Sequence, residues 1–200
     1  MDPKERILVL TAQLNEANHR YYVLDDPEMP ESTELDAVLL FTNENMNFPA
    51  EKMREFCRAD LALYAVSDPG ALRKLLQNKN PLMRDCFRVF PYYDPVITVK
   101  VTSAELHVIV AEYLKLLHKR KQFLAVSGFK FDSVRGRLHG ITLDKTKPHY
   151  TLAISAYAAA GAGGYLPETR RIIQRVADYS AAENAVGILD IITSGKVAGL

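Results

Sequence analysis

The segment from residue 96 to residue 119 constrains the fold more than any other part of the sequence. Val96–Val101 (VITVKV) is rich in β-branched residues, which indicates a strand. Thr102 and Glu105 then form a capping-box pattern, in which both side chains accept hydrogen bonds from backbone amides at the start of a helix. The helix should run to about Lys119, and its apolar positions form one buried stripe: Leu106, Ile109, Val110, Tyr113 and Leu117. A strand joined directly to a long amphipathic helix predicts helices packed on a sheet.

Further strands and helices are indicated by short apolar segments on both sides of this unit. We expect strands at 61–66, 123–126, 138–143 and 150–156, a helix at 49–58, a turn at 67–70 and a glycine-rich turn at 161–164. Two terminal helices should follow, the second capped by Ser180 and Glu183. Some strands are separated by a helix and others only by a turn, so the sheet should be mixed. The predicted fold class is α/β (α+β): a layered domain with a mixed β-sheet flanked by helices, plus an N-terminal helical extension.

The N-terminal residues form a separate helical segment in this interpretation. Asp2 and Pro3 make a helix start, because a capping side chain precedes a proline at the first helical position. The polar stretch 42–47 is the best linker candidate, so we divide the chain into residues 1–43 and residues 44–200.

Composition limits the classes of partner. The net charge of +1 favours neither nucleic acid nor an anionic membrane. The basic cluster 118–121 is interpreted as charge that complements a helix C-terminus, since no aromatic residues are interleaved with it. No apolar run is long enough to span a bilayer, and the charged start does not read as a signal peptide. Localisation stays open.

The residues that could carry metal or thiol chemistry do not form recognisable motifs. The histidines are isolated, so no catalytic metal centre is expected in this chain. Cys57 and Cys86 lack metal-site or redox spacing; two unpaired thiols are favoured, and a disulfide between them stays open. Gly161–Gly164 lacks the lysine of a phosphate loop and is interpreted as a tight turn.

Three blocks, in order, resemble the C-terminal, substrate-binding domain of 5′-nucleotidases over about residues 44–198. They are Ala59–Leu63 with a later arginine, then Arg88–Pro95 running into VITVKVTSAEL, and then FLAVSGFKFDS, RLHGITLD and YTLAISAYAAAGAGGYL. The resemblance implies a domain that holds a nucleotide or nucleoside, with the base between two aromatic rings. It also implies that hydrolysis belongs to a metallophosphoesterase domain with two divalent metals, so no cofactor is expected in this chain. The family is usually extracytoplasmic.

The resemblance assigns roles to four residues. Tyr92 and Tyr157 match the two aromatic positions of the base clamp, where stacking suits any base because each has a π-face. Arg73 matches the arginine that contacts the charged or polar end of the substrate, and Asp94 stands where the family has a base-contacting asparagine. An ionised carboxylate only accepts hydrogen bonds, so this change alters base recognition. The family's acidic residue in the glycine turn falls on Gly163.

A second resemblance covers residues 5–40, where LNEANHRYYVLDDPEMPESTELD is similar to domain Ia of NAD-dependent DNA ligases. That domain recognises the nicotinamide mononucleotide half of NAD. Tyr21, Tyr22 and Asp36 keep matching residue types, whereas Glu31 replaces an aspartate and Leu35 a tyrosine. The adenylation motif KxDG does not occur in the sequence, so ligation is not expected.

Two functional hypotheses follow. The first is a nucleotide- or nucleoside-recognition domain of the 5′-nucleotidase type that is not hydrolytic by itself, with neither nucleic acid nor membrane as partner. The second is a structural or protein-interaction module that keeps the fold and has lost the ligand site.

Overall fold

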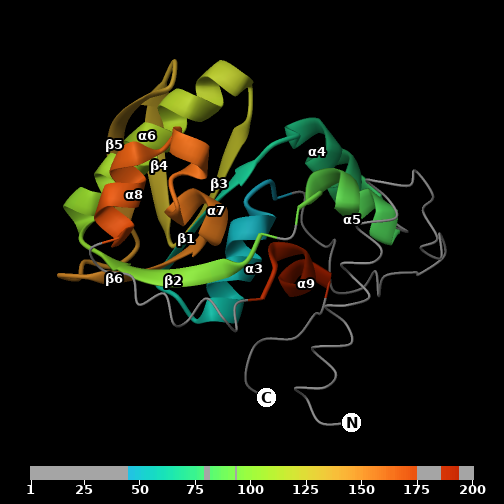
Figure 1. The fold of residues 1–200 in the computed structure, drawn as a ribbon, viewed down its shortest axis with the longest axis horizontal. Coiled ribbons are helices and arrows are strands. Elements are labelled where there is room, and N and C mark those ends of the chain that lie inside the picture. Colours follow the sequence, from blue (N-terminus) through green and yellow to red (C-terminus); the bar gives the residue numbers. More distant parts are fainter. Residues whose placement is uncertain (1–44, 79–81, 93, 175–185, 194–200) are drawn as a thin grey trace, which may run out of the picture. The chain divides into compact units, whose positions relative to one another are not determined.

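The computed structural model describes residues 45–78, 82–92, 94–174 and 186–193, shown as the coloured ribbon in Figure 1. The expected N-terminal helices, the domain boundary at residue 43, the first half of the 42–47 linker, and the capping residues Ser180 and Glu183 lie outside these residues. Within the described residues the strands are β1 (Leu61–Val66), β2 (Val96–Val101), β3 (Phe123–Ser127), β4 (Phe129–Val134), β5 (Arg137–Leu143) and β6 (Tyr150–Ser155). The helices are α3 (Phe48–Cys57), α4 (Pro69–Gln77), α5 (Met83–Val89), α6 (Ser103–Arg120), α7 (Ala156–Ala159), the 3₁₀ turn η2 (Ala162–Gly164), α8 (Pro167–Gln174) and α9 (Ile188–Thr193).

Four strands form one mixed sheet in the order β2-β6-β1-β3, and β4 pairs with β5 as a separate hairpin. β1 runs parallel to β6 and antiparallel to β3, and β2 runs antiparallel to β6. The predicted mixed sheet flanked by helices is therefore confirmed.

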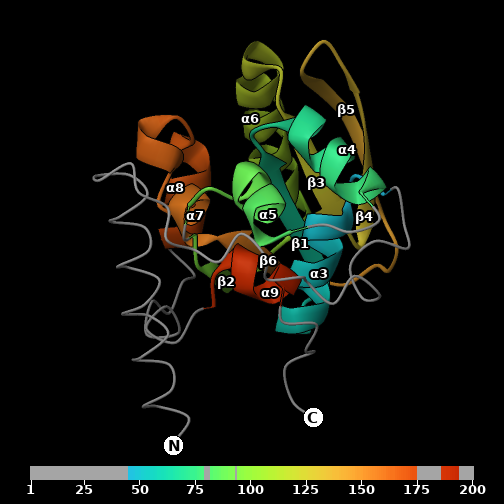
Figure 2. The same ribbon diagram turned by 90° about the vertical axis from the view of Figure 1, so that its right-hand side faces the viewer.

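The strand alternation gives the central sheet two different apolar faces. One face carries large aliphatic side chains, such as Leu63, Leu152 and Ile154, which belong to the same buried cluster as the α6 stripe. The other face carries alanines at its centre, namely Ala62, Ala125 and Ala153, which share a second cluster with residues of α3, α4, α5 and α9. Small side chains allow a helix to approach a sheet closely. In both Figure 1 and Figure 2, α6 lies on one side of the sheet and α3 with α9 on the other.

The segment from 96 to 120 folds as predicted. The amide of Glu105 donates to the Thr102 hydroxyl at 3.2 Å, and the amide of Thr102 donates to the Glu105 carboxylate at 2.8 Å. All five residues of the predicted stripe are buried.

Three elements differ from the sequence-based expectation. The expected turn at residues 67–70 is the start of α4, because the Asp68 carboxylate caps the helix by accepting from the Ala71 amide at 2.9 Å and Pro69 occupies its first turn. α5 was not expected, and neither was β4, which is separated from β3 by Gly128 alone.

Both cysteines are free, as favoured from their spacing. Burial raises the pKa of the Cys57 thiol to about 11 and that of the Cys86 thiol to about 12, so both stay protonated at neutral pH. Among the described helices, none combines the length and the apolar character that crossing a membrane requires.

Candidate functional site

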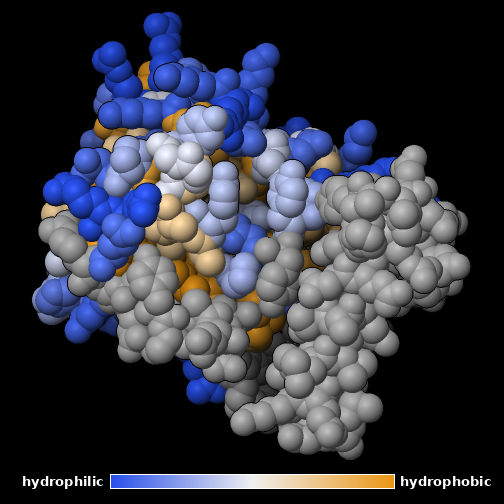
Figure 3. All heavy atoms as spheres, in the orientation of Figure 1, coloured by the Kyte–Doolittle hydropathy of each residue, from blue (hydrophilic) through white to orange (hydrophobic). Residues whose placement is uncertain are grey.

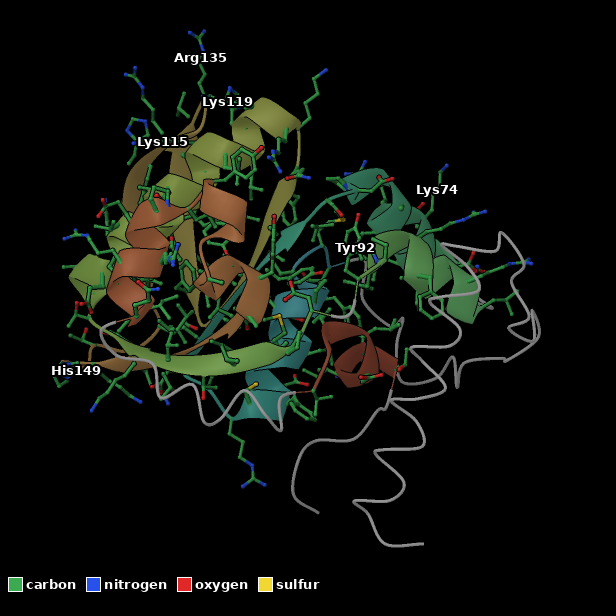
Figure 4. All side chains as sticks on the ribbon, viewed as in Figure 1. Lys74, Tyr92, Lys115, Lys119, Arg135 and His149 are labelled. Atoms are coloured by element: carbon green, nitrogen blue, oxygen red, sulfur yellow. The ribbon has the colours of Figure 1, made fainter. Side chains whose placement is uncertain are left out.

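Two exposed tyrosines lie at the ends of neighbouring chain segments. Tyr92 is on the connection between α5 and β2, where Figure 4 labels it, and is 72% exposed. Tyr157 is in the first turn of α7, directly after β6, and is 58% exposed. Large apolar rings are normally buried, so an exposed pair is the kind of feature that marks a binding surface.

Asp94 joins the two segments. One of its carboxylate oxygens accepts from the Tyr157 amide at 3.1 Å. The Ala156 amide also donates to the Pro95 carbonyl at 2.7 Å, and the Ile188 amide donates to the Asp94 carbonyl at 3.2 Å. Tyr92 is two residues from Asp94, so the fold brings the two tyrosine segments together across the intervening sequence. Among the described residues the ring–ring contact is between Tyr64 and Phe90, so the rings of Tyr92 and Tyr157 do not touch each other.

The Asp94 carboxyl group lies in a partly desolvated position. Desolvation raises its pKa above the ordinary value, whereas hydrogen bonds from the Tyr157 amide and the Ser155 hydroxyl oppose that rise. Ser155 also caps α7, because its hydroxyl accepts from the Ala158 amide at 3.3 Å. Asp94 therefore holds the start of α7, next to the expected base clamp.

We expect Asp94→Asn to remove a pH dependence of stability. Because the folded-state pKa is raised, ionisation of Asp94 disfavours the folded state, and this effect grows as pH rises from about 4 through the folded-state pKa. An asparagine oxygen can still accept from the Tyr157 amide, but it does not ionise. Thermal unfolding from pH 4 to pH 8 should show the variant gaining stability relative to the wild-type chain as pH rises. A constant difference across this range would contradict the assignment.

Arg73 lies on α4, and its side chain is exposed. A hollow of about 420 Å³ lies between α4 and α5, lined by Asp68, Gly70, Ala71, Lys74, Leu75, Asn78, Asp85 and Arg88. Arg73 does not line this hollow; its neighbour Lys74 does.

The carboxylates of the hollow are engaged by the protein itself. Asp68 caps α4, and Asp85 accepts from the Leu82 amide at 3.0 Å and from the Asn78 side chain at 3.2 Å. Lys74 and Arg88 form no ion pair with a carboxylate of a described residue. Two cations facing one hollow suit an anionic group. Sequence reasoning missed both residues, although Arg88 stands in the same block as Tyr92.

The glycine turn lies against Tyr157. A β-carbon at Gly163 would lie 3.5 Å from the Tyr157 hydroxyl, and Gly163 has a φ of +66°. This is an ordinary contact distance, so position 163 neighbours the expected clamp even though it carries no side chain here. The backbone conformation favours glycine at this position.

The potential metal-ligating side chains of the described residues are dispersed. Within the ranges that the structure describes, no three His, Cys, Asp or Glu side chains gather closely enough to hold a metal ion.

Comparison with known proteins gives two separate likenesses. Residues 1–40 match a family model described as the DNA ligase-like, N-terminal NAD+-binding domain. No curated protein matches the sequence.

Solved structures resemble the larger part of the chain. A 5′-nucleotidase precursor from Thermus thermophilus has a TM-score of 0.54 at 12% identity, over 81% of this chain and 34% of its own. A putative 5′-nucleotidase from Staphylococcus aureus has a TM-score of 0.54 at 14% identity, over 83% of this chain and 36% of its own. The NAD nucleotidase of Haemophilus influenzae has a TM-score of 0.49 at 16% identity, over 79% of this chain and 29% of its own.

The chain thus spans about a third of the length of these enzymes. The likeness expected from the sequence is confirmed for the fold: the described domain has a fold found in 5′-nucleotidases, and the N-terminal residues match the ligase-like model.

Proposed function

We propose that residues 45–193 recognise a nucleotide or nucleoside, with the base held between Tyr92 and Tyr157. The observation that carries this proposal is the hydrogen bond from the Tyr157 amide to Asp94, which fixes the second tyrosine beside the segment that bears the first. Both rings are exposed and can contact a ligand without rearrangement of the core. The 5′-nucleotidase fold supports the same class of ligand.

The charged end of such a ligand is assigned to the α4–α5 region. Arg73, Lys74 and Arg88 provide positive charge there, and the last two line the hollow. A guanidinium group can donate two parallel hydrogen bonds to a phosphate, which adds orientation to charge attraction. Hydrolysis of the bound nucleotide would depend on a metal-bearing phosphoesterase domain outside the described residues.

The test is calorimetric titration of AMP and adenosine into the wild-type chain, Tyr157→Ala and Tyr157→Phe. A base–aromatic stack contributes about 1–3 kcal/mol, so the alanine variant should bind about fivefold more weakly or worse. The phenylalanine variant keeps the ring and should bind about as tightly as the wild-type chain. Because the side chain is exposed, neither substitution should change the melting temperature appreciably.

Two results would reject the proposal. One is the absence of AMP and adenosine binding to the wild-type chain at millimolar ligand. The other is equal binding by Tyr157→Ala and the wild-type chain. The first result would favour the alternative function, a structural or protein-interaction module that keeps the fold. The second would mean that the ligand binds without Tyr157. The replacement of the family's turn acid by Gly163 is the feature that favours this alternative.

A second ligand site is proposed in residues 1–40, on the strength of the match to the ligase-like NAD+-binding model. We expect nicotinamide mononucleotide to bind there, with Tyr21 and Asp36 as contact residues. Titration of nicotinamide mononucleotide into the wild-type chain and Tyr21→Ala should show that the variant loses about fivefold or more in affinity, as for one lost aromatic stack. Tyr22→Phe, which keeps a ring at the neighbouring position, is the matched control. Equal affinity in Tyr21→Ala and the wild-type chain would contradict this assignment.

A further inference from the structure

Positive side chains from two elements meet at one end of the described domain. We call this surface the basic end; it comprises Lys115, His118, Lys119, Arg120 and Lys121 of α6 and its C-terminus, with Arg135 and Arg137 of the β4–β5 hairpin. The hairpin turn packs directly on α6, since a β-carbon at Gly136 would lie 2.7 Å from the His118 β-carbon. Figure 4 shows Lys115, Lys119 and Arg135 at this end, and Figure 3 shows hydrophilic side chains gathered over it.

No residue of the basic end forms an ion pair with a carboxylate of a described residue. The ion pairs of the described residues are Lys52–Glu55, Lys147–Asp60 and Arg171–Glu168, and none involves the basic end. The whole chain has a net charge of only +1. The positive side chains are therefore concentrated at this end, and they do not reflect an excess of basic residues in the chain as a whole. Lys115 and Lys119 are four residues apart on one helix face, where like charges repel.

Helix capping accounts for only part of this surface. Cations in the last turn of α6 interact favourably with the helix dipole, which explains Lys119, Arg120 and Lys121. Arg135 and Arg137 are not part of α6: they flank the hairpin glycine that packs on it, so they add two cations to an end where the last turn of α6 already carries its own. Their position against α6 adds repulsion, so the charge at this end points to an anionic partner.

An exposed aromatic ring lies at the same end. Tyr165 is 57% exposed, and the guanidinium carbon of Arg120 lies 4.3 Å from the centre of its ring. Single-stranded nucleic acids bind surfaces that combine cations for the backbone with aromatic rings on which bases stack. A membrane surface would instead require several apolar side chains for insertion, and Val134 is the large exposed apolar residue of the hairpin.

We propose that the basic end binds single-stranded nucleic acid, with its lysines and arginines on the phosphates and Tyr165 stacked on a base. The site is separate from the proposed nucleotide clamp, and its ligand is a polymer. The assignment does not depend on the clamp binding any ligand.

The test is fluorescence anisotropy of a labelled 20-nucleotide oligo(dT) with the full chain. Each phosphate contact contributes about 0.7 to the slope of log affinity against log salt for a single strand. Wild-type binding should therefore weaken steeply between 50 and 200 mM salt. The double variant Lys119→Glu/Arg135→Glu should bind at least about tenfold more weakly, and its slope should be smaller by roughly 1.4, which corresponds to two lost phosphate contacts. Tyr165→Ala should weaken binding about fivefold or more at an unchanged slope.

The matched control is Lys52→Glu/Lys100→Glu, which changes net charge equally. Lys100 lies just before the N-terminus of α6, whereas the basic end lies at its C-terminus. Because this helix of 18 residues is about 27 Å long, the charge of Lys100 is well outside the basic end. Control binding should be within about twofold of the wild-type value. The proposal fails if the wild-type chain does not bind oligo(dT) at 50 mM salt, or if the control loses as much affinity as the test variant. It also fails if Tyr165→Ala has no effect and the wild-type chain binds phosphatidylserine vesicles instead.

Discussion

Gly128→Ala is expected to lower the free energy of unfolding by about 3–5 kcal/mol, from backbone strain and overpacking together. Gly128 separates β3 from β4 and has a φ of +82°. An added β-carbon would lie 2.2 Å from the Asp60 carbonyl oxygen, which is backbone and cannot rotate away. The register of β1 with β3 starts immediately beside this contact, at Ala62 and Ser127. Relief of the clash would therefore disturb the central sheet.

Urea denaturation followed by circular dichroism measures this effect. The midpoint should fall with little change in the denaturant slope, since the surface exposed on unfolding stays the same. Gly140→Ala is the matched control: Gly140 lies in β5, and a β-carbon added there would have no neighbouring atom within 4 Å. It should change stability by no more than about 1 kcal/mol, in either direction. Similar midpoints for the two variants would show that the Asp60 carbonyl does not exclude a β-carbon at position 128.

The sequence predicted a helix or strand correctly where the residues of that segment alone determine its structure. β1 and β2 have the expected bounds, because each is a short apolar run between clear breaks. α4 was missed because Asp68-Pro69-Gly70 is equally a turn and a helix start. The following residues decide between them by burying Leu72, Leu75 and Leu76 in the second cluster. That choice depends on tertiary packing, which the local sequence does not contain.

In the candidate site, too, some features could be predicted from the sequence and others depend on tertiary packing. The family resemblance was enough to choose Tyr92 and Tyr157. The bridging role of Asp94 could not be predicted, because it depends on where β2 and β6 pair. The predicted roles of Tyr92, Tyr157, Arg73 and Asp94 in ligand binding remain predictions. Likewise, the cluster 118–121 lacks an aromatic in sequence, and the fold supplies Tyr165 from a distant turn.

Glu112→Ala is expected to destabilise the domain by about 2–4 kcal/mol, because it leaves the start of α8 without its acceptors. Glu112 lies on α6, and its carboxylate accepts from the Glu168 amide at 3.0 Å, the Thr169 amide at 2.8 Å and the Thr169 hydroxyl at 2.7 Å. Thr169 is fully buried in the folded chain, and removal of the carboxylate leaves its hydroxyl without its hydrogen-bond acceptor. α8 also contributes Ile172 and Ile173 to the core. Thermal unfolding measures the loss.

Glu168→Gln is the control that separates the capping of α8 by Glu112 from the general effect of removing a negative charge. Glu168 forms an exposed ion pair with Arg171 at 2.6 Å on the same helix, so its neutralisation should change stability by less than about 0.5 kcal/mol.

α8 follows the glycine turn that approaches the Tyr157 hydroxyl, and α7 packs against α8. Loss of the Glu112 acceptor should therefore also weaken AMP binding at temperatures where the variant remains folded. Unchanged stability in Glu112→Ala would refute the capping role. Reduced stability with unchanged AMP affinity would show that α8 supports the core without positioning the clamp.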